Sequence, residues 1–329
     1  MMNIELVKCH GSGNDFIIID EMEGDISFNE DERSSLAMAL CSRTSLLGAD
    51  GILFVMPSEQ SHARMRVFNA DGSEASMCGN GLRCVARYAS DKLRKSKLII
   101  ETMKANLAVE KTEEIFDGIP TFKVEISPVS FNVKDLPLNL SWETLKNERI
   151  VELSDTLLFT ALAVPNPHLV SIVESDVLKS SVQKDIATLV NGPNDLFPDG
   201  VNVSFVHELK KGHIFVRTFE RGVGFTNACG TAMSASSLVT CLNGLNETEK
   251  EISVYNDGGM VKCMVHQQNG RYQIDLIGNG TYEYRAEIEV NPADFQNFKL
   301  VNKEIFEEET SKYAKLQEYA KQFVSEHMK

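Results

Sequence analysis

The sequence lacks a surplus of positive charge. Its 33 Lys and Arg residues are outnumbered by 47 Asp and Glu residues, which gives a formal net charge of -14 at pH 7. The sequence pI is near 5.0, and no basic stripe interrupts the acidic composition. Because nucleic acids are bound largely through attraction to their phosphates, these features argue against DNA or RNA as a partner.

Long apolar runs are also absent. No stretch approaches the length that is needed to cross a bilayer, and residues 1–8 contain no apolar core of signal-peptide length. The sequence therefore predicts a cytoplasmic protein without a membrane partner.

Cysteine pairs of the kind that hold metal ions are missing as well. The chain has no C-x-x-C pair with nearby histidines, so we expect no metal site. In a large acidic chain without a secretion signal the cysteines should be free thiols rather than a disulfide framework. Four of them stand in apolar contexts and are expected to be small buried side chains: Cys41, Cys84, Cys241 and Cys263.

Two other cysteines, Cys78 and Cys229, each begin a Gly-containing turn that opens a helix-like run. The first is reached through the segment 69–78 and the second through the segment 220–229. Asn69 and Glu220 hold the same place relative to their cysteines. The two turns therefore resemble copies of one motif.

The correspondence extends far upstream of the cysteines. Asn14 precedes Cys78 by 64 residues, and Asn166 precedes Cys229 by 63. Strand-like runs follow each asparagine, and an Asp-Gly landmark lies between asparagine and cysteine in both halves: 16–19 with 49–55, and 168–173 with 198–206. Such spacing predicts an internal duplication of one unit that contains helices and strands.

The last segment differs in character from both halves. Strand patterns dominate residues 1–290, and Ser127-Pro128 is a plausible boundary between the halves. Residues 293–329 instead carry apolar side chains three to seven apart among many charges, which is typical of an amphipathic helix. We expect this segment to be a helical C-terminal extension.

A thiol at the start of a helix has the chemistry of a proton carrier. The helix dipole and unpaired N–H groups favour its thiolate, and a following glycine lets the backbone approach an anion such as a carboxylate. If the two turns faced each other, they would hold one carboxylate and place a sulfur on each face of the adjacent carbon. One thiolate and one thiol could then remove and return a proton. A redox pair forming a disulfide is the main alternative role for the two cysteines.

The residues around these landmarks resemble the diaminopimelate epimerase family, from Lys8 to about Val290. The resemblance rests on five groups of motifs: 10–16, 69–73 with 77–87, 165–168, 200–202, and 220–224 with 228–231. It implies an isomerase that interconverts LL- and meso-2,6-diaminopimelate without a cofactor, in lysine and peptidoglycan precursor biosynthesis. A homodimer is implied as well.

The resemblance also implies an α+β fold of two pseudo-symmetric domains. Each domain is a curved mixed sheet wrapped around a central helix, with the active site between them. The expected domains are residues 1–128 completed by a returning strand at 279–292, residues 129–278, and the extension at 293–329.

Roles for individual residues follow from the same resemblance. Cys78 and Cys229 match the acid/base pair of the family, and His168 matches a supporting polar neighbour. Ten residues match substrate-binding positions: Asn14, Asn69, Gly79, Asn80, Asn166, Asn202, Glu220, Arg221, Gly230 and Thr231. A guanidinium and several amides suit a substrate with two zwitterionic ends.

The sequence departs from the common family pattern at Gly51, Phe225 and Ala232. None of these changes removes a group that the chemistry needs, but they leave the substrate open. The alternative is a cofactor-independent racemase of another amino acid on the same fold. A non-catalytic binding protein or thiol sensor is a further alternative, although it would need only one of the two cysteines or an oxidised pair.

Overall fold

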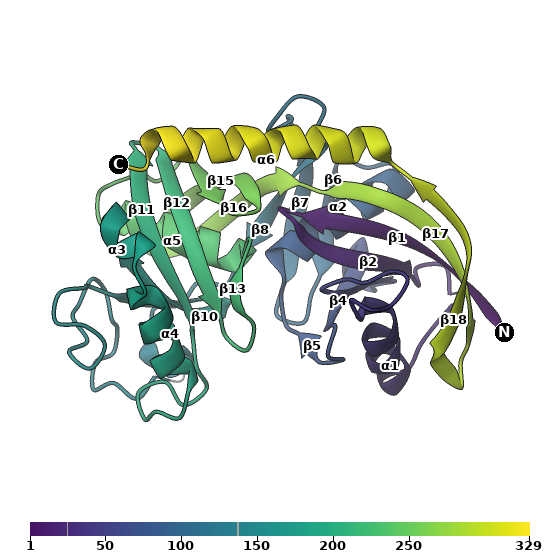
Figure 1. The fold of residues 1–329 in the computed structure, drawn as a ribbon, viewed down its shortest axis with the longest axis horizontal. Helices are drawn as coiled ribbons and strands as arrows, with labels where there is room; N and C mark the ends of the chain where they lie inside the picture. The colour runs from purple at the N-terminus through teal and green to yellow at the C-terminus, as the bar shows by residue number, and fades with distance from the viewer. Residues whose placement is uncertain (25, 137) are drawn as a thin grey trace. The chain divides into compact units, whose positions relative to one another are not determined.

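The computed structural model describes residues 1–24, 26–136 and 138–329. The chain forms two compact units. Unit 1 comprises Met1–Val124 with Gly278–Lys315, and unit 2 comprises Glu125–Ile277 with Leu316–Lys329. Both units combine helices with a mixed sheet, so the predicted α+β class is confirmed (Figure 1).

Unit 1 is built on a mixed sheet. Neighbouring strands pair in the order β1-β2-β3-β4-β6-β7-β8, with short β5 on β4, and only β2–β3 and β4–β6 are parallel. The strands are β1 (Met2–Gly11), β2 (Asn14–Asp20), β3 (Gly51–Met56), β4 (Ala63–Asn69), β5 (Glu74–Ala75), β6 (Lys97–Glu101), β7 (Asn106–Thr112) and β8 (Thr121–Ile126). The helices are α1 (Glu30–Cys41) and α2 (Gly79–Leu93).

Unit 2 repeats this plan. Its strands pair in the order β9-β10-β11-β12-β14-β15-β16, with short β13 on β12, and only β10–β11 and β12–β14 are parallel. The strands are β9 (Thr160–Val164), β10 (Asn166–Ile172), β11 (Asn202–Lys210), β12 (His213–Glu220), β13 (Gly224–Thr226), β14 (Glu251–Asn256), β15 (Gly259–Gln268) and β16 (Arg271–Asn279). The helices are η1 (Val133–Asp135), α3 (Ser175–Lys179), α4 (Val182–Asn191) and α5 (Gly230–Leu242).

The two sheets therefore share strand order and strand direction at every step. Helices also fall between matching strands, with α2 between β5 and β6 and α5 between β13 and β14. The internal duplication predicted from the sequence is confirmed by this topology.

Each unit packs a central helix against its own strands. Helix α2 contacts β1, β2, β3, β4, β6 and β7, and α5 contacts β9, β10, β11, β12, β14 and β15. The α5 residues from Gly230 to Thr240 are all buried. Two of its buried hydroxyls donate hydrogen bonds within the helix, Ser234 to Gly230 O and Ser237 to Met233 O. These small polar side chains therefore need no partner on the strands, and the helix can pack closely against them.

The C-terminal segment corrects one prediction. The expected helical extension at 293–329 begins instead with a strand, β18 (Asp294–Ile305), and helix α6 covers only Glu307–His327. Strand β17 (Thr281–Asn291) pairs with β1 on one side and with β18 on the other. Main-chain hydrogen bonds to the edge of β17 make residues 294–305 a strand, although a few apolar side chains in this segment have helical spacing.

Helix α6 contributes to both units, with residues through Lys315 in unit 1 and residues from Leu316 in unit 2. In unit 2 the ring of Phe323 stacks on Tyr255, with ring centroids 4.5 Å apart. Gln317 donates to Gly258 O at 3.2 Å in the same unit. In the part of the chain that the structure describes, no helix combines the length and the apolar character needed to span a membrane.

Candidate active site

Cys78 caps the N-terminus of α2 in unit 1. Its backbone is extended (φ -144°, ψ 109°), and its sulfur accepts the N–H of Gly81 at 3.3 Å. A Cβ at Gly81 would lie 2.7 Å from Leu53 Cδ2, so this turn of the helix has no room for a side chain there. The sequence motif therefore places a thiol at the N-terminal, positive end of the dipole of a 15-residue helix.

Two amides lie beside this thiol. Cys78 Sγ donates to Asn14 Oδ1 at 3.8 Å, and Asn80 Nδ2 donates to the same oxygen at 3.2 Å. The other end of the Asn14 amide donates to Asp50 Oδ2 at 2.6 Å. Because Asp50 can only accept when ionised, it fixes which way the Asn14 amide points. Asn14 Oδ1 is thereby turned toward Cys78.

Gly79 and Asn69 are the remaining predicted residues of unit 1. Gly79 is the first residue of α2 and is buried. Asn69 ends β4 with an exposed side chain, and its Nδ2 donates to Ser73 Oγ at 3.0 Å. The structure thus brings Asn14, Asn80 and Cys78 into direct contact, whereas Asn69 binds within its own turn.

Cys229 caps α5 in unit 2 and is only 8% exposed. Burial raises the pKa of its thiol well above the ordinary value, and the negative charge of Glu220 raises it further. The expectation that a helix N-terminus lowers this pKa is wrong for Cys229 in the ligand-free protein. Loss of hydration and a neighbouring carboxylate both disfavour a thiolate more than the helix end favours it.

A buried histidine lies behind the second thiol. His168 is fully buried, and its Nε2 lies 3.1 Å from Thr231 Oγ1. That hydroxyl is in turn 3.6 Å from Cys229 Sγ. Burial lowers the pKa of His168 to about 3, with a smaller effect from the charge of Arg221, so the ring is neutral. The chain His168–Thr231–Cys229 links the start of β10 to the start of α5, where Gly230 is also buried.

Glu220 is the last residue of β12 and is partly buried. Its Oε1 accepts from Thr226 Oγ1 at 2.5 Å, and its carboxylate is also hydrogen-bonded to the Cys229 thiol. The sequence prediction that Glu220 lies beside the second cysteine is consistent with this arrangement.

Arg221 follows directly and is exposed. Its N–H donates to Asn202 Oδ1 at 2.9 Å, and its Nη1 donates to Asp199 O at 2.8 Å. Gly200 has a positive φ of 68°, and a Cβ there would come within 3.1 Å of Arg221 Cδ. Glycine at position 200 therefore allows the positive φ of the turn and leaves room for the side chain of Arg221 to pass. Asn166, the first residue of β10, is half-buried.

Strand register shows how the halves have diverged. His168 pairs with Asn202 on the neighbouring parallel strand, and the matching pair in unit 1 is Phe16 with Gly51. Gly51 is thus equivalent to Asn202. A Cβ at Gly51 would lie 2.5 Å from the main-chain oxygen of Phe68. The neighbouring strand therefore leaves no space for a side chain at this position, where the sequence departs from the common family pattern.

Two residues that contact the amides beside Cys78 have no role in the sequence prediction. Asp50 belongs to the Asp-Gly landmark of the first half, and Arg83 lies in the motif 77–87. Arg83 is fully buried, and its Nη2 donates to Asn80 Oδ1 at 3.1 Å. A charged residue three positions after Asn80 on a buried helix face is the signal that could have identified it.

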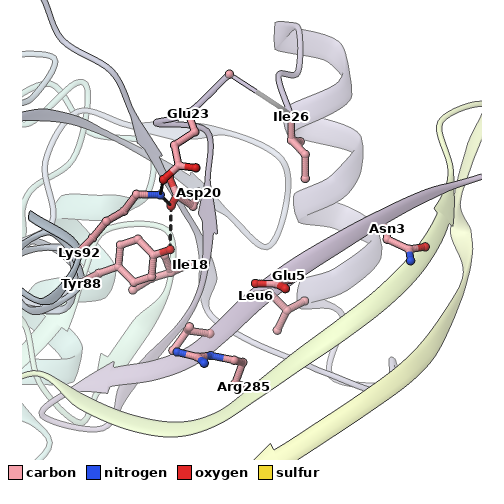
Figure 2. Close-up of a pocket in the computed structure, with 12 residues that line it drawn as sticks. Asn3, Glu5, Leu6, Ile18, Asp20, Glu23, Ile26, Tyr88, Lys92 and Arg285 are labelled. Atoms are coloured by element: carbon pink, nitrogen blue, oxygen red, sulfur yellow. Dashed lines mark hydrogen bonds and ion pairs between the residues drawn. The ribbon is translucent and has the colours of Figure 1, made fainter.

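A surface pocket of about 430 Å³ lies elsewhere in unit 1. In Figure 2, Lys92 and Tyr88 of α2 point toward Asp20, which accepts from Tyr88 Oη at 2.8 Å and pairs with Lys92. Lys92 also pairs with Glu23 at 2.8 Å. The described residues that line this pocket include none of the predicted site residues, so it is not the candidate site. Across residues 1–24, 26–136 and 138–329, no group of three or more His, Cys, Asp or Glu side chains is arranged to hold a metal ion.

Comparison with known proteins identifies the family. The family model described as "Diaminopimelate epimerase" matches residues 6–118 and 160–280. A diaminopimelate epimerase of Ligilactobacillus salivarius is 50% identical over 306 residues, which cover 91% of this chain and 94% of that protein. The chain belongs to the diaminopimelate epimerase family. A family relative from Clostridium acetobutylicum is 44% identical over 322 residues, covering 98% of this chain and 96% of that protein.

A solved structure extends the likeness of fold beyond the epimerase family. The Bacillus anthracis phenazine biosynthesis protein of the PhzF family superposes with a TM-score of 0.60 at 18% identity, covering 88% of this chain and all of that chain. At this identity the match supports the duplicated α+β fold alone.

Glu220→Gln should make Cys229 more reactive. Removing the carboxylate charge lowers the pKa of Cys229 toward its ordinary value, so more thiolate is present at a given pH. We expect iodoacetamide to modify Cys229 several-fold faster in the variant at pH 8, as measured by mass spectrometry of its peptide. Glu247→Gln, which removes an exposed carboxylate of the same unit, is the control and should leave the rate unchanged. Equal rates in Glu220→Gln and wild-type protein would contradict the assigned cause.

Proposed function

We propose that this chain interconverts LL- and meso-diaminopimelate at one α-carbon, where one of the two cysteines, Cys78 and Cys229, removes the proton from one face and the other delivers its own proton to the opposite face. The observation that carries the proposal is the placement of both thiols at equivalent helix N-termini of a duplicated fold, in a chain of this family. A thiol at each helix start suits a reaction that needs a proton acceptor on one face of a carbon and a donor on the other.

Removal of the proton leaves negative charge on the α-carboxylate of the substrate. N–H groups at a helix N-terminus have no acceptor within the helix and are suited to bind such a carboxylate. We assign this role to the first turns of α2 and α5, which contain Gly79-Asn80 and Gly230-Thr231. Fixed donors at developing charge stabilise a transition state without reorganising.

The two thiols exchange roles with the direction of the reaction. In one direction Cys78 takes the α-proton and Cys229 supplies its own proton to the opposite face, and in the reverse direction the roles are exchanged. The raised pKa of Cys229 keeps its proton on the sulfur in the ligand-free protein, which suits a proton donor. Two interacting thiols titrate as a pair, so pH–rate profiles should be assigned to both together.

The other predicted residues fit the rest of the substrate. The exposed guanidinium of Arg221 suits the distal carboxylate. The oriented amide oxygen of Asn14 is an acceptor suited to an ammonium group, and Asn69, Asn166 and Asn202 supply further amides. The homodimer that the resemblance implies and the cytoplasmic location that the lack of apolar runs predicts remain predictions.

The proposal is tested by incubating the reduced protein with LL-diaminopimelate in deuterated water, without added pyridoxal phosphate or metal. Thiol protons exchange with solvent, so the meso product should carry one deuterium at the inverted α-carbon, measured by mass spectrometry and chiral chromatography. A folded protein that gives no deuterated product would overturn the proposal. Conversion of another amino acid in place of diaminopimelate would instead favour a racemase on this fold.

A further inference from the structure

The unit 1 residues of the C-terminal helix α6 meet the turn between β1 and β2. Tyr313 of α6 is 4% exposed, and its ring packs edge-on against His10 with ring centroids 4.3 Å apart. The side chain of Tyr313 is also hydrogen-bonded to Ser12 in that turn. Both Tyr313 and the rest of α6 lie beyond residue 280, where the match to the family model ends.

Ser12 connects this tyrosine to a buried arginine. Its backbone has a positive φ of 57°, and its N–H donates to Asn279 Oδ1 at 2.9 Å. Its hydroxyl accepts from Arg83 Nη2 at 2.9 Å. Arg83 Nε also donates to Asn279 O at 3.1 Å. The guanidinium is therefore oriented by the two residues Ser12 and Asn279.

Arg83 in turn orients the amides at the first thiol. It donates to Asn80 Oδ1 at 3.1 Å, so the other end of that amide, Nδ2, faces Asn14 Oδ1 at 3.2 Å. Asn14 Oδ1 also accepts from Cys78 at 3.8 Å. A continuous hydrogen-bonded path thus runs from Tyr313 through Ser12, Arg83 and Asn80 to the atoms that contact Cys78.

The docking of α6 on unit 1 is itself specific. Glu309 pairs with Arg87 of α2, with its Oε2 3.0 Å from Arg87 Nη2. Its Oε1 also accepts the N–H of Tyr282 at 2.7 Å. Arg87 lies one helical turn after Arg83, so α6 contacts α2 directly beside the arginine that the path passes through. Glu309 and Tyr313, one turn apart on α6, face unit 1 together.

We propose that Tyr313 is a positioning residue of the candidate active site. Its hydroxyl holds Ser12 and thereby Arg83, so that the amides of Asn80 and Asn14 keep their orientation at Cys78. This assignment rests on the proposed role of Cys78. Helix α6, which lies outside the region that the family model matches, would then help to position the residues around Cys78.

The test is Tyr313→Phe, which keeps the ring against His10 and removes only the hydroxyl. We expect kcat to fall on the order of tenfold because small misplacements of reacting groups are costly. KM should change much less, since Arg221 and the distal contacts are untouched, and the thermal midpoint should stay within about 2 °C. Tyr319→Phe is the matched control, because it removes a phenol hydroxyl from the same helix that is bonded to Tyr255. It should keep wild-type kinetics.

A double-mutant cycle shows whether the effect passes through Ser12. Ser12→Gly removes the hydroxyl and tolerates the positive φ. In that background Tyr313→Phe should cause no further loss of kcat. Wild-type kcat in Tyr313→Phe would overturn the inference, and so would the same fold-loss in both backgrounds. Cys78→Ala, assayed in parallel, separates the two proposals. If it retains activity the proposed function fails, whereas an inactive Cys78→Ala with a fully active Tyr313→Phe defeats only the positioning role.

Discussion

Replacing either Cys78 or Cys229 by alanine should reduce epimerisation by at least about 1000-fold, because each variant lacks the proton donor or acceptor on one face of the substrate carbon. The loss should be seen in kcat with LL- and with meso-diaminopimelate, since each direction uses both sulfurs. Coupled assays of product stereochemistry in each direction would measure it.

Loss of a cysteine outside the predicted site is not expected to reduce the rate of epimerisation. Cys41 and Cys263 are fully buried, and neither belongs to the predicted site. Alanine at either position should lower stability modestly and leave kcat near the wild-type value, which circular dichroism melts and the same assays would show. Wild-type epimerisation by Cys78→Ala or Cys229→Ala would refute the two-base mechanism.

Arg221→Met should reduce kcat/KM for diaminopimelate roughly 100-fold, mainly through KM. A buried or bound carboxylate that loses a charge-assisted guanidinium contact forfeits a large share of binding energy. Because Arg221 is exposed and its Nη1 donates to a main-chain oxygen, Asp199 O, the thermal midpoint should change little. Steady-state kinetics with both stereoisomers provide the measurement.

Two control variants separate the loss of the Arg221 guanidinium from a general loss of positive charge. Arg271→Met removes an exposed positive charge at the start of β16 and should leave KM unchanged. Arg221→Lys keeps the charge but not the planar fork, so it should recover only part of the lost affinity. An unchanged KM in Arg221→Met would mean that the distal carboxylate, if the substrate has one, is bound elsewhere.

The duplication could be read from the sequence because its landmarks occupy the same structural positions. Asn14 and Asn166 begin equivalent strands, and Cys78 and Cys229 cap equivalent helices. N-cap and strand-end positions require particular residue types, so they remain recognisable when the rest of the halves diverges.

Element ends were harder to predict because tertiary contacts decide them. Helix α1 ends at Cys41, where Ser42 turns to an extended ψ of 127° and Ser45 Oγ donates to Leu40 O. Strand β18 likewise depends on the neighbouring edge of β17. Neither cause is visible in local spacing.

The candidate site was predictable in position but not in its electrostatics. Residue motifs located Cys229, yet its burial and its distance from Glu220 are products of the fold, and they reverse the expected direction of its pKa. The contact of Asp50 with Asn14 joins two residues that are 36 positions apart, so no local motif announces it. The roles of the predicted residues stay predictions.

The pairing of β1 with β17 has a consequence for synthesis of the protein. Met2 lies opposite Val290, so β1 acquires its second neighbour only after nearly 290 further residues have been added. Most of β1 is buried in the finished fold, and an unpaired strand edge of that kind is prone to join other chains. Unit 1 therefore stays incomplete until its second segment, residues 278–315, has been made, and β1 is the segment most in need of protection while translation proceeds.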